Sequence, residues 1–185
     1  MDKISDKILW DDYFLTLAFV AAQRSIDIST KCGCVIVSKD HRVLSIGYNG
    51  PLKGIKDETV PRGRPNKYWW TIHSEENALL AYNGSNLDIE GATAYITGLP
   101  CDRCLTSLLQ KGITRIVVSN INVAVMCEAG KNPAWDDCLE MMEQKNATLE
   151  VKNVLCVSDV LTKTHSYIAN YIEDNRIVIP TGKIV

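Results

Sequence analysis

The sequence predicts an α/β fold: a three-layer α/β/α sandwich around a mixed five-stranded sheet. Some segments carry apolar residues at helical spacing, and others are short β-branched runs. A polar turn joins the first two runs, which predicts an antiparallel hairpin. The later runs alternate with helical segments, and right-handed crossovers make such strands parallel. A chain of 185 residues fits one core, so we expect a single domain over 1–185 with a short C-terminal extension from about residue 155.

The first half of the chain supplies a helix and the hairpin. Asp12–Ile26 carries apolar residues on one face and is expected to be an amphipathic helix. Cys32–Ser38 and Val43–Tyr48 are apolar and β-branched, and the polar turn at 39–42 joins them as strands. Gly50–Asn66 is rich in Gly and Pro, which predicts a long loop, and long loops inside compact domains are often functional.

The second half of the chain alternates helices and strands. Asn83-Gly84 ends one predicted helix, Gly112 closes the next, and Pro133 suits the first turn of a third. The expected elements, in order, are helix His73–Tyr82, strand Ala92–Thr97, helix Cys101–Lys111, strand Ile113–Ser119, helix Pro133–Lys145, strand Thr148–Val154 and a short helix around Val160–Tyr171.

Composition excludes several classes of protein. The formal net charge of −2 provides no global positive field for nucleic-acid phosphates, so we expect no polynucleotide partner. No apolar run reaches the roughly 18 residues that a membrane span needs, and residues 1–10 lack the apolar stretch of a signal peptide. We therefore expect a cytoplasmic protein with no membrane partner.

The seven cysteines include one C-x-x-C pair. In a reducing compartment, this usage favours metal ligation over disulfides. Three other cysteines are assigned to packing, namely Cys127, Cys138 and Cys156. The basic residues around the long loop are expected to be solvated, with a lid or an effector site as the alternative; they are Lys53, Lys56, Arg62, Arg64 and Lys67.

Two short segments, each opening a predicted helix, carry the chemistry. His73-Ser74-Glu75 and the P-C-x-x-C at 100–104 match the H-x-E…P-C-x-x-C pattern of zinc nucleobase deaminases. One imidazole and two thiolates, from His73, Cys101 and Cys104, leave the open position that a catalytic Zn²⁺ keeps for water. Both cysteines lie in a first helical turn, where the helix dipole favours thiolate.

Glu75 is predicted to be the catalytic acid and base. It lies two residues from His73, so on a regular helix the two side chains point in different directions and Glu75 is poorly placed to share the metal. It can still reach a water on zinc, take its proton as C4 of cytosine is attacked, and pass that proton to N3 and the leaving amine. A non-catalytic zinc-stabilised interaction module is the competing hypothesis, but such a site usually has a fourth Cys or His and has no use for this carboxylate.

From about Asp12 to Val154 the chain resembles the deoxycytidylate deaminases of the cytidine deaminase superfamily. The matching segments are Arg24-Ser25, Cys32–Val37, Ser45–Pro51, His73–Leu80 and Tyr95–Cys104. The resemblance implies a cytidine deaminase-like fold and zinc-dependent hydrolysis of dCMP to dUMP and ammonia, which supplies dUMP for thymidylate synthesis. It also implies a homo-oligomer, by analogy a hexamer, with dCTP and dTTP as effectors.

The resemblance also suggests substrate-binding residues. Asn49, in the Gly-Tyr-Asn-Gly segment, matches the asparagine that contacts the deoxyribose. Arg24 and Lys31 stand where cations could meet the phosphate, and an Arg fork suits a phosphate. Ser74 stands where the family usually has Ala, and we group it with the substrate-binding residues.

Other substrates remain alternatives at this point. Cytidine and dCTP would use the same chemistry, whereas a tRNA-editing adenosine deaminase would normally need a stronger cationic surface. Some members of the family carry an extra structural zinc before the catalytic helix. Only Cys32 and Cys34 lie upstream here, with no matching His, so no second zinc is expected.

Overall fold

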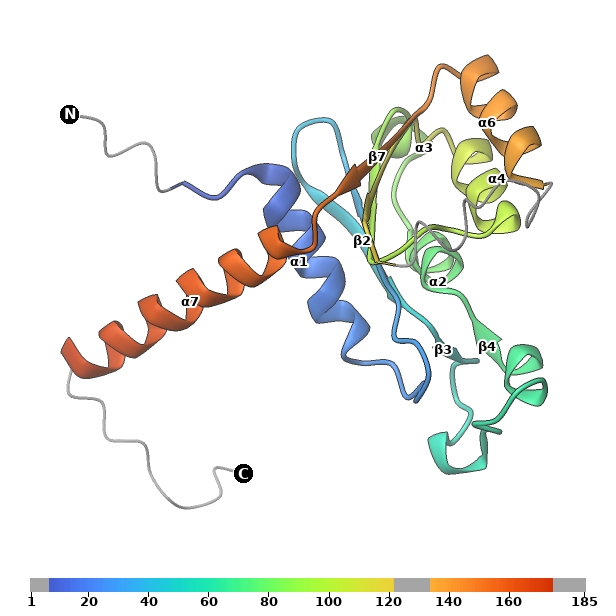
Figure 1. Cartoon of the computed structure of the whole chain (residues 1–185). Coiled ribbons are helices and arrows are strands. Elements are labelled where there is room, and N and C mark those ends of the chain that lie inside the picture. Colours follow the sequence, from blue (N-terminus) through green and yellow to red (C-terminus); the bar gives the residue numbers. More distant parts are fainter. Residues whose placement is uncertain (1–6, 122–133, 175–185) are drawn as a thin grey trace.

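The computed structural model describes residues 7–121 and 134–174, which form a sheet covered by helices on both faces (Figure 1). The strands of the sheet are β1 (Gly33–Val37), β2 (Val43–Tyr48), β5 (Thr93–Ile96), β6 (Arg115–Ser119) and β7 (Thr148–Lys152). Their order is β2-β1-β5-β6-β7. β1 is antiparallel to both of its neighbours, whereas β5, β6 and β7 are parallel. The predicted mixed five-stranded sheet is confirmed.

The helices divide between the two faces of the sheet. Their bounds are α1 (Trp10–Ala22), α2 (Ser74–Ala81), α3 (Asn86–Ile89), α4 (Asp102–Gln110), α6 (Ala134–Gln144) and α7 (Leu155–Asp174). α1 and the first part of α7 cover one face, and α2, α4 and α6 cover the other (Figure 1). None of the helices in the described residues is both long and apolar enough to cross a membrane.

Strand periodicity explains why the core has two halves. In β1, Val35 and Val37 pack with α1, while Cys34 and Ile36 pack with α2 and α4. Successive side chains of a strand point to opposite faces, and here both faces are covered. All five residues of β1 are therefore buried, which accounts for its unbroken apolar sequence.

Several elements differ from the predictions. α1 covers 10–22 rather than 12–26, because the chain after Ala22 turns into a loop whose N–H groups bond to Ser25 and Asp27 side chains. The long loop is closed at its base by a two-stranded sheet of β3 (Gly50–Pro51) and β4 (Thr71–Ile72). It also holds the 3₁₀ turns at 57–59 and 66–69.

The short helix expected near the C-terminus is instead α7, a helix of 20 residues. Val157 and Val160 are buried near its start, whereas residues 161–170 are exposed and extend away from the body of the molecule (Figure 1). Cys138 is buried and Cys156 packs against the α1 side of the core. Cys127 and the predicted helix start at Pro133 lie outside the described residues.

Candidate active site

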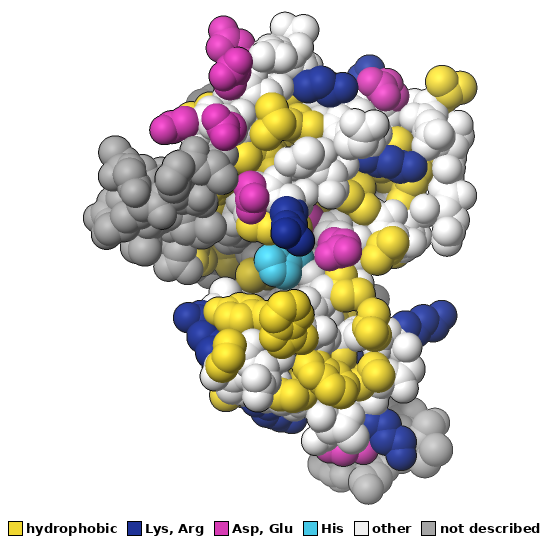
Figure 2. All heavy atoms as spheres, turned by 90° about the vertical axis from the view of Figure 1, so that its right-hand side faces the viewer, with side chains coloured by type: hydrophobic (Ala, Val, Ile, Leu, Met, Phe, Trp, Pro, Cys, Tyr) yellow, Lys and Arg dark blue, Asp and Glu magenta, His cyan; other side chains and the backbone are white. Residues whose placement is uncertain are grey.

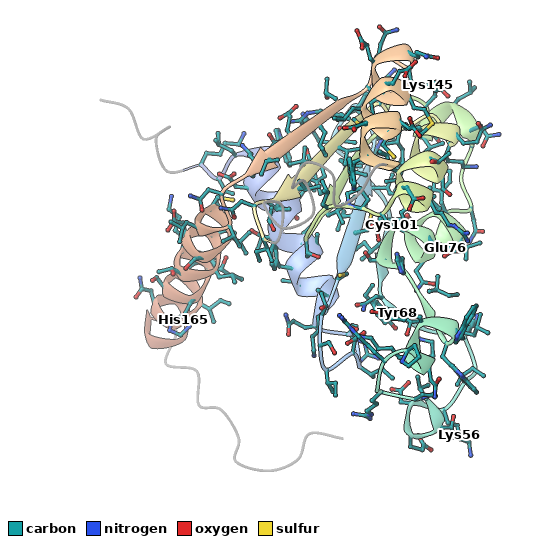
Figure 3. The ribbon with its side chains drawn as sticks, turned by 45° about the vertical axis from the view of Figure 1, so that its right-hand side comes forward. Lys56, Tyr68, Glu76, Cys101, Lys145 and His165 are labelled. Atoms are coloured by element: carbon teal, nitrogen blue, oxygen red, sulfur yellow. The ribbon has the colours of Figure 1, made fainter. Side chains whose placement is uncertain are left out.

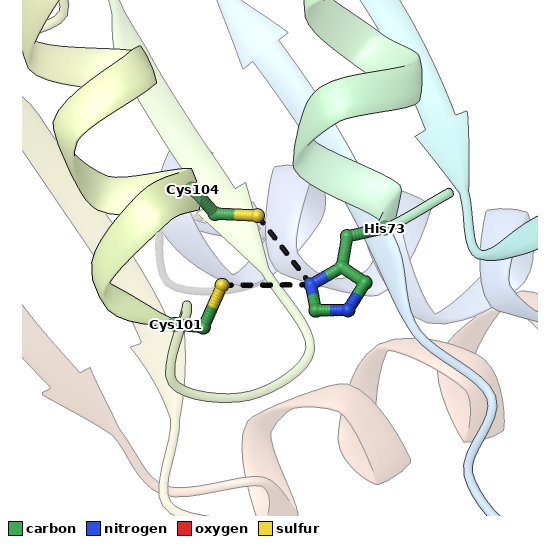
Figure 4. Close-up of side chains that lie close together, drawn as sticks. All are labelled: His73, Cys101 and Cys104. Carbon is green, nitrogen blue, oxygen red and sulfur yellow. Dashed lines mark hydrogen bonds between the residues drawn. The ribbon is translucent and has the colours of Figure 1, made fainter. Parts of the chain in front are cut away.

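Three predicted ligands converge between the starts of α2 and α4. His73 Nδ1 lies 3.6 Å from Cys101 Sγ and 3.5 Å from Cys104 Sγ (Figure 4). All three atoms lie within 4.8 Å of one another. A tetrahedral zinc ion, with Zn–N of about 2.0 Å and Zn–S of about 2.3 Å, holds the nitrogen and each sulfur about 3.5 Å apart. The donor set and its spacing therefore fit zinc, with a fourth position left for water.

The helix starts account for the placement of the ligands. His73 is the N-cap residue of α2, and Cys101 is the N-cap residue of α4. Cys104 lies in the first turn of α4 and is buried. Free backbone N–H groups and the positive end of each helix dipole thus face the cluster, and they stabilise thiolates there.

The two thiols behave as a coupled pair. The hydrogen bond from Cys104 lowers the pKa of Cys101 to about 4, and His73 acts in the same direction while burial opposes it. The same contact with Cys101, together with burial, raises the pKa of Cys104. A divalent cation at this place would favour the thiolate form of both sulfurs.

Glu75 brings a buried carboxyl group to the same helix start. Its side chain is 5% exposed, and its Oε2 accepts a hydrogen bond of 2.6 Å from Ser74 Oγ. Burial raises the pKa of Glu75, while the Ser74 hydrogen bond and the nearby His73 partly offset this effect. A carboxyl group with a raised pKa exchanges protons more readily near neutral pH, as general acid–base catalysis requires.

Close packing against β2 fixes α2 and the ligand that precedes it. A Cβ at Gly47 would lie 2.2 Å from the Ser74 carbonyl oxygen, so only glycine permits this approach. Ser45 Oγ donates to the Ala78 carbonyl at 2.6 Å, and Asn77 Nδ2 donates to the Tyr48 carbonyl at 2.8 Å. The backbone of α2 is thereby attached to β2 along two turns.

The structure does not bring the four predicted substrate-binding residues into one cavity. Asn49 is buried and lines a small cavity of about 20 Å³ with Asp27. Arg24 lines an open cavity of about 420 Å³, and Lys31 is exposed beside a third cavity of about 540 Å³. Ser74 is completely buried, and its hydroxyl group is bonded to Glu75.

A buried ion pair that the sequence did not predict lies beside Asn49. Lys67 was expected to be solvated with the rest of its loop, and that prediction is wrong because the residue is only 6% exposed. Its ammonium group binds the carboxylate of Asp27. The partners are 40 residues apart, so no local spacing indicates this contact.

A surface next to this pair is apolar. The 3₁₀ turn at 66–69 and the residue after it expose Tyr68, Trp69 and Trp70. Figure 2 shows hydrophobic side chains gathered on this face of the molecule, below a hollow in which a histidine is visible. The aromatic residues at 68–70 thus lie mainly at the surface rather than in the core.

Known proteins share this sequence pattern and fold. The family model described as "Cytidine and deoxycytidylate deaminase zinc-binding region" matches residues 8–120. The deoxycytidylate deaminase of Mus musculus is 34% identical over 121 residues, which cover 62% of this chain and 67% of that protein. The deoxycytidylate deaminase of Enterobacteria phage T2 is 33% identical over 184 residues, covering 76% of this chain and 89% of that protein.

A solved structure shares the fold. The dCMP deaminase of the cyanophage S-TIM5, in its apo form, aligns with a TM-score of 0.57 and 23% identity, covering 77% of this chain and 96% of that chain. The family match spans both ligand-bearing segments. The chain therefore belongs to the cytidine and deoxycytidylate deaminase family.

Proposed function

We propose that this protein is a zinc-dependent deaminase that hydrolyses dCMP to dUMP and ammonia. One observation carries the proposal. An imidazole nitrogen and two sulfurs converge at zinc-ligand spacing, and the buried carboxyl group of Glu75 lies in the first turn of α2, the helix that His73 caps. The relatives named deoxycytidylate deaminases support the choice of substrate. The S-TIM5 enzyme has also been crystallised with dCMP and dUMP.

The proposed reaction divides the work between the metal ligands and Glu75. His73, Cys101 and Cys104 would hold a zinc ion, which would supply Lewis acidity and lower the pKa of water. Glu75 takes a proton from the attacking water as the bond from oxygen to C4 forms, and it delivers that proton to N3. It then takes the second proton from the new hydroxyl group on C4 and passes it to the departing amino group. The bond between C4 and nitrogen breaks as the C4 carbonyl forms, so that ammonia leaves and a uracil base remains.

We assign substrate recognition to polar groups around this centre. Asn49 would bind the deoxyribose, because an amide can both donate to and accept from a hydroxyl group. Arg24 and Lys31 lie in the loop after α1, and both would attract the phosphate because they are cations near the surface. Ser74 would act through Glu75, because its hydroxyl group donates a hydrogen bond to the Glu75 carboxylate.

The deciding experiment measures zinc content and substrate preference together. Purified protein should hold about one zinc per chain, and kcat/KM should be higher for dCMP than for cytidine or dCTP. Glu75→Ala should retain zinc and lose turnover, whereas Cys101→Ala should lose both. Cys156→Ala, on the opposite side of the sheet, is the matched thiol control and should retain both. Zinc-loaded protein with no activity on any of the three compounds would overturn the proposal, and equal rates on all three would remove the phosphate argument.

Assembly and regulation are proposals by resemblance, and the cellular compartment is a proposal from the sequence prediction above. We propose a homo-oligomer, by analogy a hexamer, that responds to dCTP and dTTP and works in the cytoplasm. Light scattering of the purified protein tests the assembly, and a monomer at micromolar concentration would contradict it. Rates measured with and without dCTP and dTTP test the regulation.

A further inference from the structure

We infer that Lys67 is a positioning residue for substrate binding, which acts through Asp27 on the side-chain amide of Asn49. This inference rests on the proposed function, because it assumes that Asn49 binds the sugar of the substrate. It adds two residues, Lys67 and Asp27, to the machinery of the site.

The first step is a buried ion pair between two loops. Lys67 Nζ donates to Asp27 Oδ1 at 2.9 Å and to Oδ2 at 2.7 Å. The side chains are only 7% and 10% exposed. Removing an ammonium group from water is costly unless it is paired, and such pairs add little net stability compared with apolar packing. A lysine buried here therefore indicates a need for fixed geometry.

The second step is a set of hydrogen bonds that connects Asp27 to Asn49 through the turn at 29–30. Asp27 Oδ1 also accepts the backbone N–H groups of Ser29 at 2.7 Å and Thr30 at 3.1 Å, so it holds the turn in shape. Asn49 Nδ2 donates to the Thr30 carbonyl at 2.9 Å, and its Oδ1 accepts from Cys32 N at 2.7 Å. Hydrogen bonds on either side of the Thr30 backbone thus connect the lysine to the amide of Asn49.

The third step connects Asn49 to the catalytic helix. The preceding residue, Tyr48, accepts a hydrogen bond from Asn77 on α2 through its carbonyl. Asn49 is consequently held by α2, which begins beside His73, by the backbone of Cys32 and by the turn that Lys67 holds through Asp27. We expect loss of the lysine to loosen the attachment through the turn and to leave the metal ligands in place.

The test compares KM with kcat in the zinc-loaded full chain. Lys67→Met should raise KM for dCMP by between about 10- and 100-fold, since a displacement of about 1 Å in a binding group has effects of this size. Zinc content should stay at the wild-type level, and kcat should change by less than about 3-fold because Glu75 and the metal ligands are untouched. Lys67→Arg, which keeps the charge, should recover most of the affinity. Lys56→Met is the matched control, because Lys56 is exposed at the far tip of the same loop (Figure 3), and it should leave KM unchanged.

A double-mutant cycle separates a positioning role from a merely structural one. If Lys67 acts through Asn49, Lys67→Met should add less than about 2-fold to the KM of Asn49→Ala. Fully additive effects, or a lower melting temperature with unchanged KM, would overturn the inference. If Lys67→Met does not fold, Asp27→Asn takes its place in the cycle under the same criteria. If the wild-type enzyme deaminates dCMP and the Lys67 variants keep a normal KM, this inference alone is contradicted. If the wild-type enzyme has no deaminase activity, the proposed function is contradicted as well.

Discussion

Asp11 and Glu75 are carboxyl groups on opposite faces of the sheet, and their surroundings shift their pKa values in opposite directions. Asp11 binds the guanidinium group of Arg115 through both oxygens at 2.9 Å and accepts a hydrogen bond from Tyr95. The Arg115 contact lowers the pKa of Asp11 to about 2. Burial raises the pKa of Glu75, whose carboxylate accepts a hydrogen bond from the neutral hydroxyl of Ser74.

The difference separates a structural carboxylate from a catalytic one. Arg115 also binds Glu150 through two hydrogen bonds of 2.7 Å, so α1, β6 and β7 are joined by a network in which each charge has an opposite neighbour. A carboxylate in such a network stays ionised and holds elements together. A carboxyl group with a raised pKa in a buried position can instead gain and lose a proton during a reaction. Four predictions test this comparison, from the largest expected effect to the smallest.

Glu75→Gln should abolish most of the activity without weakening the fold. The amide cannot transfer protons, so kcat should fall by about 100- to 10,000-fold. The free energy of unfolding should not decrease, because a neutral group replaces a buried acid. Steady-state rates, zinc content and urea denaturation provide the measurements. Glu76→Gln, at the exposed neighbouring position (Figure 3), is the control and should keep its activity; near-normal turnover of Glu75→Gln would contradict the assignment.

Arg115→Met should show the opposite pattern. Removing the cation leaves Asp11 and Glu150 facing each other with only Lys152, 3.5 Å from Asp11, as a partial counter-charge. This should lower the free energy of unfolding by about 2 kcal/mol at this partly buried site. The kcat/KM value should remain within about 2-fold of wild type, since the network lies on the face away from the metal ligands. Arg42→Met breaks an exposed pair with Asp40 and should cost much less stability, because solvent screens that pair. Equal destabilisation by the two substitutions would disprove the distinction.

Acid should weaken the Asp11 network before it weakens the rest of the fold. The folded-state pKa of Asp11 is lowered to about 2 from an ordinary 3.8, so its contribution is complete above pH 4 and is lost as pH falls toward 2. Over this range the wild-type protein should lose about 1–2 kcal/mol more than Arg115→Met does. Denaturation midpoints measured from pH 5 to pH 2 give both slopes, and parallel slopes would count against the ion pair.

Ser74→Ala should have the smallest effect. It removes the hydrogen bond that lowers the pKa of Glu75, so that pKa should rise further and the acid limb of the kcat profile should move to higher pH. At neutral pH the loss of kcat should be only about 2- to 5-fold, because Glu75 and the metal ligands remain. An unchanged pH profile would mean that Ser74 does not influence the carboxylate during turnover.

Local sequence patterns were sufficient for the sheet and for the metal ligands. Alternating strand and helix periods predicted all five strands of the sheet, since burial on both faces leaves unbroken apolar runs such as β1. The convergence of the candidate ligands was also predictable, because His73 and Cys101 are N-cap residues, Cys104 lies in the first turn after Cys101, and the spacing within each segment is local. The roles of Glu75 and of the proposed substrate-binding residues stay predictions until the variants are measured.

Only the tertiary structure decided which distant residues meet. Distant segments meet in the ion pair of Lys67 with Asp27 and in the pairing of β3 with β4. Arg24 and Asn49, in contrast, line different cavities. No period or spacing encodes such contacts. They arise because a long loop has to satisfy its buried charges and backbone groups with whatever partners the packed sheet and helices place beside it.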